Sequence, residues 1–82
     1  MEVSRLESPL RMLRSSINKN VLVKVKEGNS YTGQLIFADN TMNLVMINAE
    51  EISEDDLRPI ARYGTILIRG SQILYVVIDY KK

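Results

Sequence analysis

The 82-residue chain contains neither cysteine nor histidine. Disulfide bonds are therefore ruled out, and the two absences together exclude the ordinary zinc and haem sites. They also remove the commonest nucleophile and general base of enzymes. A chain of this length buries only about 60–65% of its unfolded surface, so partner subunits are the remaining way to add stability.

Long apolar runs and glycine-rich stretches are missing as well. No segment approaches the ~20 apolar residues that span a bilayer, and no secretory signal is visible, so we expect a cytoplasmic protein without a membrane partner. The four glycines stand singly, so no glycine-rich loop can cradle a phosphate. With no catalytic constellation or metal-ligand set, we expect a binding and assembly protein, not an enzyme, that needs no cofactor.

Charge is modest in total but uneven along the chain. The net charge is +1, yet six basic residues and only two acidic ones precede residue 27, and five of the ten acidic residues lie between Glu50 and Asp56. The acidic cluster lacks the ligand spacing and turn glycine of a calcium loop, which favours a solvated patch. Some of the bases either coat a face that attracts phosphate groups or merely solvate an amphipathic helix, and both readings stay open for Arg5, Arg11, Arg14 and Lys19.

A single helix is predicted at the start of the chain, over about residues 8–18. Ser8 is a suitable N-cap and Pro9 suits the first helical position. Leu10, Leu13 and Ile17 form one apolar stripe. A helix of about three turns is too short to be stable alone, so we expect it to pack on the rest of the domain.

Five short strands are predicted after residue 19, where the apolar period changes to two. They are "NVLVKVK", "YTGQLIFA", "MNLVMINAEEI", "GTILIRG" and "ILYVVI", with "SEDDLRPIARY" as a charged loop. Gly33, inside the second strand, marks a sharp bend or bulge of the kind a small barrel needs. The whole chain, residues 1–82, is therefore predicted to be one mainly β domain: a helix followed by a strongly bent five-stranded antiparallel barrel with its core over about 19–79.

The last strand, "ILYVVI", is apolar on both faces and carries no charge, proline or glycine. At an open sheet edge such a strand favours pairing with another chain. Head-to-tail pairing of edges gives a ring if the rotation closes. We therefore predict that the chain associates with further copies of itself.

Two segments resemble the motifs of one family. "YTGQLIFADNTMNLVMINAEEI" resembles the first motif of the Sm and Sm-like (LSm) proteins, and "YGTILIRGSQILYVV" resembles the second, centred on Ile-Arg-Gly. The resemblance runs from about Leu10 to Ile78 and is greatest to archaeal members. It implies the Sm fold, an SH3-like barrel, and a homo-oligomeric ring, commonly of seven copies, in which the fourth strand of one copy pairs with the fifth strand of the next. The residues expected at this contact are Ile66, Leu67, Ile68, Leu74, Tyr75, Val76 and Val77. The resemblance also implies a site for uridine-rich single-stranded RNA at the inner rim of the ring.

The resemblance gives a role in RNA binding to Asp39, Thr41, Asn43, Arg69, Gly70 and Ser71. The Asn43 carboxamide places a donor beside an acceptor and is expected to read the edge of uracil bidentately. Asp39 is expected to orient this amide, Arg69 to stack on a base, and Gly70 to let the backbone approach the nucleotide. The alternative, in which Asn43 only caps a turn begun by Asp39 and Asn40, stays open.

Two positions depart from the family pattern. Many Sm-like proteins have His, Tyr or Phe where this chain has Thr41, and Asn or Asp is commoner than Ser71 after Arg-Gly. Base–aromatic stacking contributes about 1–3 kcal/mol per base, of which a threonine methyl recovers only part. We therefore expect weaker binding per base or a looser preference for uridine.

Two functions follow from these features. The first is an RNA-binding ring acting in RNA processing, in ribonucleoprotein assembly or as an RNA chaperone. The second is a structural ring or protein-interaction hub with weak or no RNA binding. In either case the expected partners are further copies of the chain, other Sm-like paralogues or RNA-processing proteins.

Overall fold

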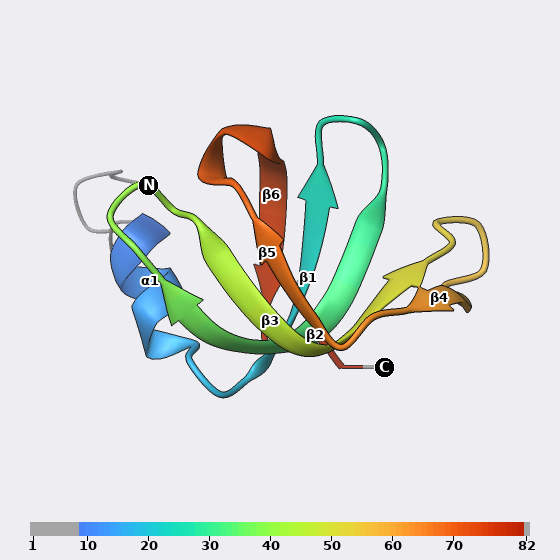
Figure 1. The fold of residues 1–82 in the computed structure, drawn as a ribbon, viewed down its shortest axis with the longest axis horizontal. Helices are drawn as coiled ribbons and strands as arrows, with labels where there is room; N and C mark the ends of the chain where they lie inside the picture. The colour runs from blue at the N-terminus through green and yellow to red at the C-terminus, as the bar shows by residue number, and fades with distance from the viewer. Residues whose placement is uncertain (1–8, 82) are drawn as a thin grey trace, which may run out of the picture.

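A short helix and a strongly bent antiparallel sheet make up residues 9–81, the part of the chain that this computed structural model describes (Figure 1). The mainly β architecture with one N-terminal helix is confirmed. In chain order the elements are α1 (Pro9–Ser15), β1 (Asn20–Val25), β2 (Ser30–Ala38), β3 (Leu44–Ile52), β4 (Pro59–Arg62), β5 (Thr65–Ile68), a 3-10 turn (Gly70–Gln72) and β6 (Ile73–Ile78).

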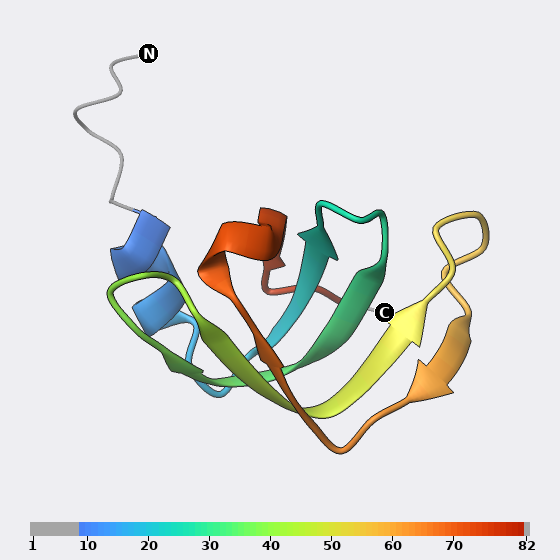
Figure 2. The same ribbon diagram turned by 45° about the horizontal axis from the view of Figure 1, so that its top comes forward.

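The sheet has two different edges. Its strand order is β4-β3-β2-β1-β6, and β5 pairs with the first half of β3 while β4 pairs with the second half. Figure 2 shows that α1 and the β3–β4 hairpin lie at opposite ends of the curved sheet. Between Pro9 and Lys81 no ladder joins β5 to β6, so each of these two strands keeps one edge unpaired.

The long strands β2 and β3 bend together at Gly33. Their register shifts between Thr32 and Gln34. A Cβ atom at Gly33 would lie 3.0 Å from the carbonyl oxygen of Ile47 and 3.2 Å from the Cα atom of Ala49. Because these neighbours are backbone atoms, a side chain at this position would push the two strands apart. The bend predicted at Gly33 is therefore confirmed.

In β1 the core follows the predicted alternation except at Leu22, which is buried as well. Val21 and Val23 of β1 are fully buried, whereas Lys24 between Val23 and Val25 is only half-buried. The other residues of the core cluster come from α1, β1, β2, β3 and β5, namely Leu13, Val25, Leu35, Ala38, Leu44, Met46, Ala49 and Ile68. Leu13 is the residue through which α1 is anchored to the sheet. In the described range no helix has the length and apolar character needed to cross a membrane.

The helix ends earlier than predicted, at Ser15 instead of near residue 18. The hydroxyl groups of Ser15 and Ser16 both donate to the carbonyl oxygen of Met12, at 2.8 and 3.0 Å. Asn18 then adopts a left-handed conformation with φ 73°, which turns the chain toward β1. The predicted cap, Ser8, lies outside the described residues.

The segment predicted as a charged loop, residues 53–63, contains the strand β4, so the prediction was wrong there and the sheet has six strands instead of five. Pro59 begins this strand, a place where the missing N–H is tolerated. Arg62 lies opposite Glu50 in the ladder, and their side chains form an ion pair at 3.0 Å. β3 also begins at Leu44, later than predicted, because φ of 64° at Met42 takes that residue out of the extended conformation.

Candidate nucleic-acid interface

The carboxylate of Asp39 is the centre of the loop between β2 and β3. Its Oδ1 accepts hydrogen bonds from the backbone N–H groups of Thr41 and Asn43 and from the Thr41 hydroxyl, each at 2.9 Å. Its Oδ2 accepts a bond from Asn43 Nδ2 at 3.0 Å. The N–H of Asn43 is the main cause that lowers the pKa of the Asp39 carboxyl, followed by the Thr41 hydroxyl. The contacts predicted for Asp39 as an orienting residue are present.

Met42, at the tip of this loop, has a backbone conformation that non-glycine residues avoid. Its φ is 64°, a conformation that costs about 1–3 kcal/mol and persists only where the surrounding contacts offset that cost. Here its N–H donates to the carbonyl oxygen of Asp39 at 2.9 Å, and its side chain packs against the core. The loop is therefore held in one conformation from both sides.

The Asn43 carboxamide joins the two segments that carry the family motifs. Its Nδ2 donates to Asp39 Oδ2 at 3.0 Å and to Thr41 Oγ1 at 2.9 Å. Its Oδ1 accepts the backbone N–H of Gly70 at 2.8 Å, 27 residues further along the chain. Because a backbone N–H can only donate, this contact fixes which amide atom is the oxygen. Asn43 thus does close a turn, but the turn that it closes reaches the second motif.

Gly70 is needed where the turn before β6 meets the loop before β3. A Cβ atom here would lie 2.0 Å from the carbonyl oxygen of Thr41 and 3.0 Å from the carbonyl carbon of Met42. Neither backbone atom can move aside without disturbing the Asp39 loop. The structure therefore gives Gly70 a packing role that the sequence did not indicate, and its approach to a nucleotide stays a prediction.

Arg69 and Ser71 flank Gly70 and are exposed. The Arg69 side chain makes no hydrogen bond or ion pair with the other described residues, and Ser71 likewise offers a hydroxyl that none of them binds. The structure thus joins four of the six predicted residues in one hydrogen-bonded and packed unit, Asp39, Thr41, Asn43 and Gly70. Arg69 and Ser71 adjoin this unit with their side chains available.

The predicted basic residues do not form one continuous face. Arg14 of α1 donates to Asn40 Oδ1 at 2.7 Å, which brings the helix against the Asp39 loop. Arg11 is exposed on the same helix, whereas Lys19 lies just before β1 and pairs with Asp79, just after β6, at 3.6 Å. Arg5 lies outside the described residues.

Phe37 is an exposed aromatic residue that the sequence analysis did not single out. Its side chain is 49% exposed, and it lines the same surface depression as Arg14 and Thr41. The register of β2 on β3 shifts between Leu35 and Phe37, which breaks the alternation and leaves two consecutive apolar side chains on the outside. The two consecutive apolar residues Ile36 and Phe37 were the feature of the sequence that could have indicated an exposed ring. A ring beside a cation is a combination on which unpaired bases stack.

The outer edges of β5 and β6 carry most of the residues predicted at a subunit contact. Leu67 of β5 is 63% exposed, and three residues of β6 are also exposed, namely Leu74, Tyr75 and Val77. Ile66 and Val76 are half-buried. The prediction that the Ile68 side chain lies at the subunit contact is corrected, because Ile68 is only 7% exposed and belongs to the core of its own subunit.

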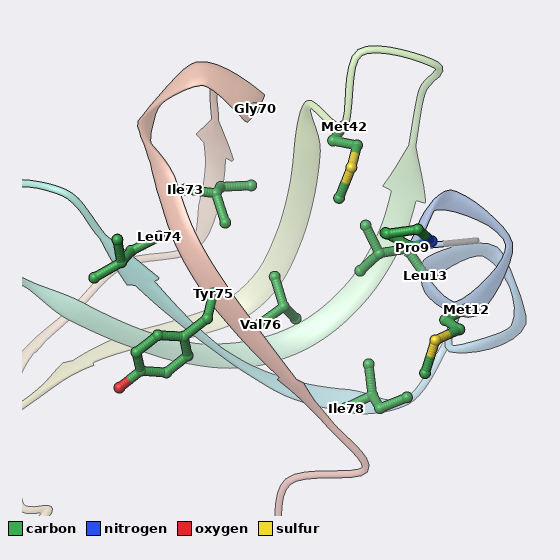
Figure 3. A pocket seen from close by; sticks show the side chains of 10 residues that line it. All are labelled: Pro9, Met12, Leu13, Met42, Gly70, Ile73, Leu74, Tyr75, Val76 and Ile78. Carbon is green, nitrogen blue, oxygen red and sulfur yellow. The ribbon is translucent and has the colours of Figure 1, made fainter. Parts of the chain in front are cut away.

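An apolar groove of about 390 Å³ lies between α1 and β6. Figure 3 shows Met12 and Leu13 of the helix, together with Met42, facing Val76 and Ile78 of β6 across this space. On the opposite side of the molecule Lys24 pairs with the acidic loop through Glu54. Across residues 9–81 no three acidic side chains come close enough together to hold a metal ion.

Comparison with known proteins agrees with this geometry. Residues 11–78 match the family model of the LSM domain. An snRNP Sm-like protein of Thermococcus kodakarensis is 40% identical over 68 residues, which cover 83% of this chain and 87% of that protein. The solved structure of the Pyrococcus abyssi Sm protein in complex with a uridine heptamer is 38% identical, with a TM-score of 0.79 and coverage of 88% of this chain and 99% of the other.

A second solved structure, the SmAP1 heptamer of Pyrobaculum aerophilum, is 30% identical to this chain, with a TM-score of 0.76. The match covers 89% of this chain and 95% of the other. The overall fold is therefore shared over nearly the full length of each of these two solved structures. On this combined evidence the chain belongs to the Sm-like (LSm) family.

Proposed function

We propose that this chain forms a ring of identical copies, seven in number, that binds uridine-rich single-stranded RNA at its inner rim. The observation that carries the proposal is the hydrogen bond from the Gly70 N–H to Asn43 Oδ1, which unites the two motif loops into one site. The P. abyssi relative, solved with a uridine heptamer, and the P. aerophilum heptamer support the ligand and the number of copies.

The ring is supported by the two unpaired edges. When β5 of one copy adds to β6 of the next, main-chain hydrogen bonds extend the sheet across the subunits. Leu67 of β5 and the exposed residues of β6, Leu74, Tyr75 and Val77, would then leave water. Burial of apolar surface contributes about 25 cal/mol per Å², so these exposed side chains supply the main driving force for assembly.

RNA binding is supported by the groups that remain available at the joined loops. The guanidinium group of Arg69 can stack on a base and hydrogen-bond at its rim. Asn43 Oδ1 keeps one free lone pair after accepting the Gly70 N–H. Arg11 and Arg14 place positive charge on the helix-bearing face, where RNA phosphates would pass. Repetition of the site around a ring raises the effective concentration of each successive nucleotide.

The role that follows is binding and not catalysis, in RNA processing, ribonucleoprotein assembly or RNA chaperoning. One observation favours a second candidate, a structural ring or protein-interaction hub with weak RNA binding. Both N–H groups of the Asn43 amide are already used within the chain, by Asp39 and Thr41. A base that needs such a donor must first displace one of them.

Fluorescence anisotropy with labelled oligo-U and oligo-A separates the two candidates. We expect Asn43→Ala to weaken binding of oligo-U selectively, while Asn20→Ala, an exposed residue at the start of β1, leaves binding unchanged. We expect Arg14→Ala to weaken both RNAs and to reduce the salt slope by roughly one, whereas Arg58→Ala, an equal change of charge on the β3–β4 loop, does not. Equal losses on both RNAs from Asn43→Ala would refute the base-reading role, and a wild-type ring that binds neither at low salt leaves the hub.

A further inference from the structure

The Thr41 hydroxyl occupies one of the two donors with which Asn43 could read a base. Asn43 Nδ2 donates one hydrogen to Asp39 Oδ2 in a partly buried contact and the other to Thr41 Oγ1 in an exposed contact. The Thr41 hydroxyl gives its own hydrogen to Asp39 Oδ1. The three side chains form a closed triangle of hydrogen bonds, and what the triangle leaves open toward solvent is acceptors only.

We infer that Thr41 is a specificity-determining residue of this site, which lowers its preference for uracil over cytosine by holding the solvent-facing N–H of Asn43. The inference rests on the proposed function. It concerns the hydroxyl group of Thr41, and it is separate from the loss of stacking that follows from the missing aromatic ring at the same position.

The two pyrimidines isolate this effect because they differ only at the edge that the amide faces. Uracil offers an N3–H donor beside the O4 acceptor, whereas cytosine offers an N4 amino donor beside the N3 acceptor. The orientation of the Asn43 amide is fixed, since Oδ1 faces the Gly70 N–H. A free Nδ2–H beside Oδ1 would suit the O4 atom of uracil and would oppose the amino group of cytosine.

In the wild-type site this discrimination is largely cancelled. Asn43 Oδ1 can accept one hydrogen bond from either base, so both pyrimidines gain a similar contact. Uracil gains its second bond only by displacing the Thr41 hydroxyl, which exchanges one hydrogen bond for another with little net benefit. Removing the hydroxyl should therefore raise the ratio of affinities for oligo-U and oligo-C by roughly threefold to tenfold, the value of one net hydrogen bond.

The variant Thr41→Val tests the inference, with Thr41→Ser as the matched control. Valine keeps the branched shape of threonine and lacks only the hydroxyl, and residue 41 is exposed with no positive φ to penalise the change. Serine keeps the hydroxyl and loses the methyl group. Any apolar contact that valine adds to a base acts on uracil and cytosine alike, so it cancels in the ratio.

Two measurements are made on the assembled protein. Anisotropy titrations with oligo-U and oligo-C of equal length give the affinity ratio, and the exchange of the Asn43 side-chain amide protons with solvent is followed by NMR. We expect both protons to be protected in the wild type and in Thr41→Ser, and one to exchange freely in Thr41→Val. We expect the affinity ratio to rise in Thr41→Val alone.

The outcomes separate this inference from the proposed function. If the wild type binds RNA but all three proteins share one affinity ratio, the specificity role of Thr41 is wrong and the RNA-binding function stands. A wild type in which one or both Asn43 side-chain protons exchange as freely as the released proton expected in Thr41→Val contradicts the triangle itself. If no RNA binds to the wild type or to either variant, the proposed function is wrong and the specificity role is lost with it.

Discussion

Asp39 gathers four hydrogen bonds on one carboxylate, two from backbone N–H groups, one from a hydroxyl and one from an amide. All four donors lie within the next four residues, so the group organises its own loop before it can act on a ligand. A carboxylate held in this way has a depressed pKa because every donor favours the charged form. Asp39 accepts hydrogen bonds from Asn43 and thereby orients the Asn43 carboxamide.

The first prediction at the residue scale concerns the pH dependence of the protein's stability. Because the pKa of Asp39 is lower in the folded protein than its usual value near 3.9, its contribution to stability is fully present above about pH 4 and is lost as the pH falls through the folded-state pKa. In Asp39→Asn an amino group would face the Asn43 Nδ2–H, so this variant lacks the contribution at every pH. We expect the wild type to unfold at higher denaturant concentration than Asp39→Asn at pH 7, with a difference that narrows below pH 4.

Urea unfolding of both proteins at a series of pH values measures that difference directly. Other carboxylates titrate in the same range, but they are common to the two proteins and leave the difference unaffected. A gap that stays constant down to pH 2 would contradict the role given to Asp39.

At the residue scale the sequence indicated which side chains matter better than it indicated what they touch. The spacing from Asp39 to Asn43 is local, so an orienting turn was predictable from it. The contact between Gly70 and Thr41 joins two loops that are separated by the whole of β3, β4 and β5, and no local pattern reports such a distance. Phe37 was missed for a related reason, because the register shift that exposes it depends on β3.

At the scale of the elements, the main feature is the contact between the two loops that carry the motif residues. The loop before β3 and the turn before β6 meet at Gly70 with backbone against backbone. Such a contact has no flexible side chain to absorb an added atom, and the hydrogen bond to Asn43 Oδ1 depends on it. The positions of the two loops are therefore set together.

Replacement of Gly70 by alanine should separate these loops. The new Cβ would lie 2.0 Å from a backbone oxygen, so we expect a loss of stability of about 1–3 kcal/mol and weaker RNA binding. The control is Gly64→Ala, since a Cβ there would meet nothing within 4 Å, and its expected change is within about 0.5 kcal/mol. Urea unfolding measures both changes, and similar midpoints for the two variants would show that the close contact is unimportant.

Elements with a clear period were predicted correctly, and short or locally strained ones were not. β1 has alternating valines and a buried face that only a strand explains. β4 has four residues, begins with proline and has mostly exposed side chains, so its pairing with β3 decides its conformation. The helix end was misplaced because Asn18 and the two serine hydroxyls stop it, not a change of apolar period.

On the scale of the whole molecule, the described residues form a sheet that is curved but not closed. β5 and β6 each have one free edge, and apolar side chains stand beside both of them. Pairing of these two edges with one another around a closed ring would protect them from uncontrolled pairing with other chains. The presence of the unpaired last strand was predictable from its composition, whereas the curvature that sets the angle between neighbours comes from the bend at Gly33.

The prediction at the scale of the whole molecule concerns the mass of the assembled protein in solution. The wild type should have a mass in solution about seven times the 9.4 kDa of one chain. Leu67→Asp places a charge on the edge of β5 and should reduce that mass strongly, with little effect on the fold of the subunit because the side chain is 63% exposed. Leu57→Asp is the control, since Leu57 is similarly exposed, at 56%, but lies on the β3–β4 loop with φ 59°, where Asp is well tolerated.

Light scattering coupled to gel filtration gives the masses, and circular dichroism checks that each subunit remains folded. A folded wild-type monomer at high protein concentration would contradict the ring, as would a Leu67→Asp protein of unchanged mass.

The bond between Gly70 and Asn43 has one more consequence, for the thermodynamics of assembly. Gly70 leads directly into β6, so in the proposed ring the residue that fixes the Asn43 amide would also set the position of the edge onto which the next copy adds. Nucleotide binding and closure of the subunit contact would then be linked equilibria. If the nucleotide binds the closed contact more tightly than the open one, each equilibrium favours the other to the same degree. RNA bound in the central hole would thereby keep the protomers associated at dilutions where the RNA-free ring dissociates.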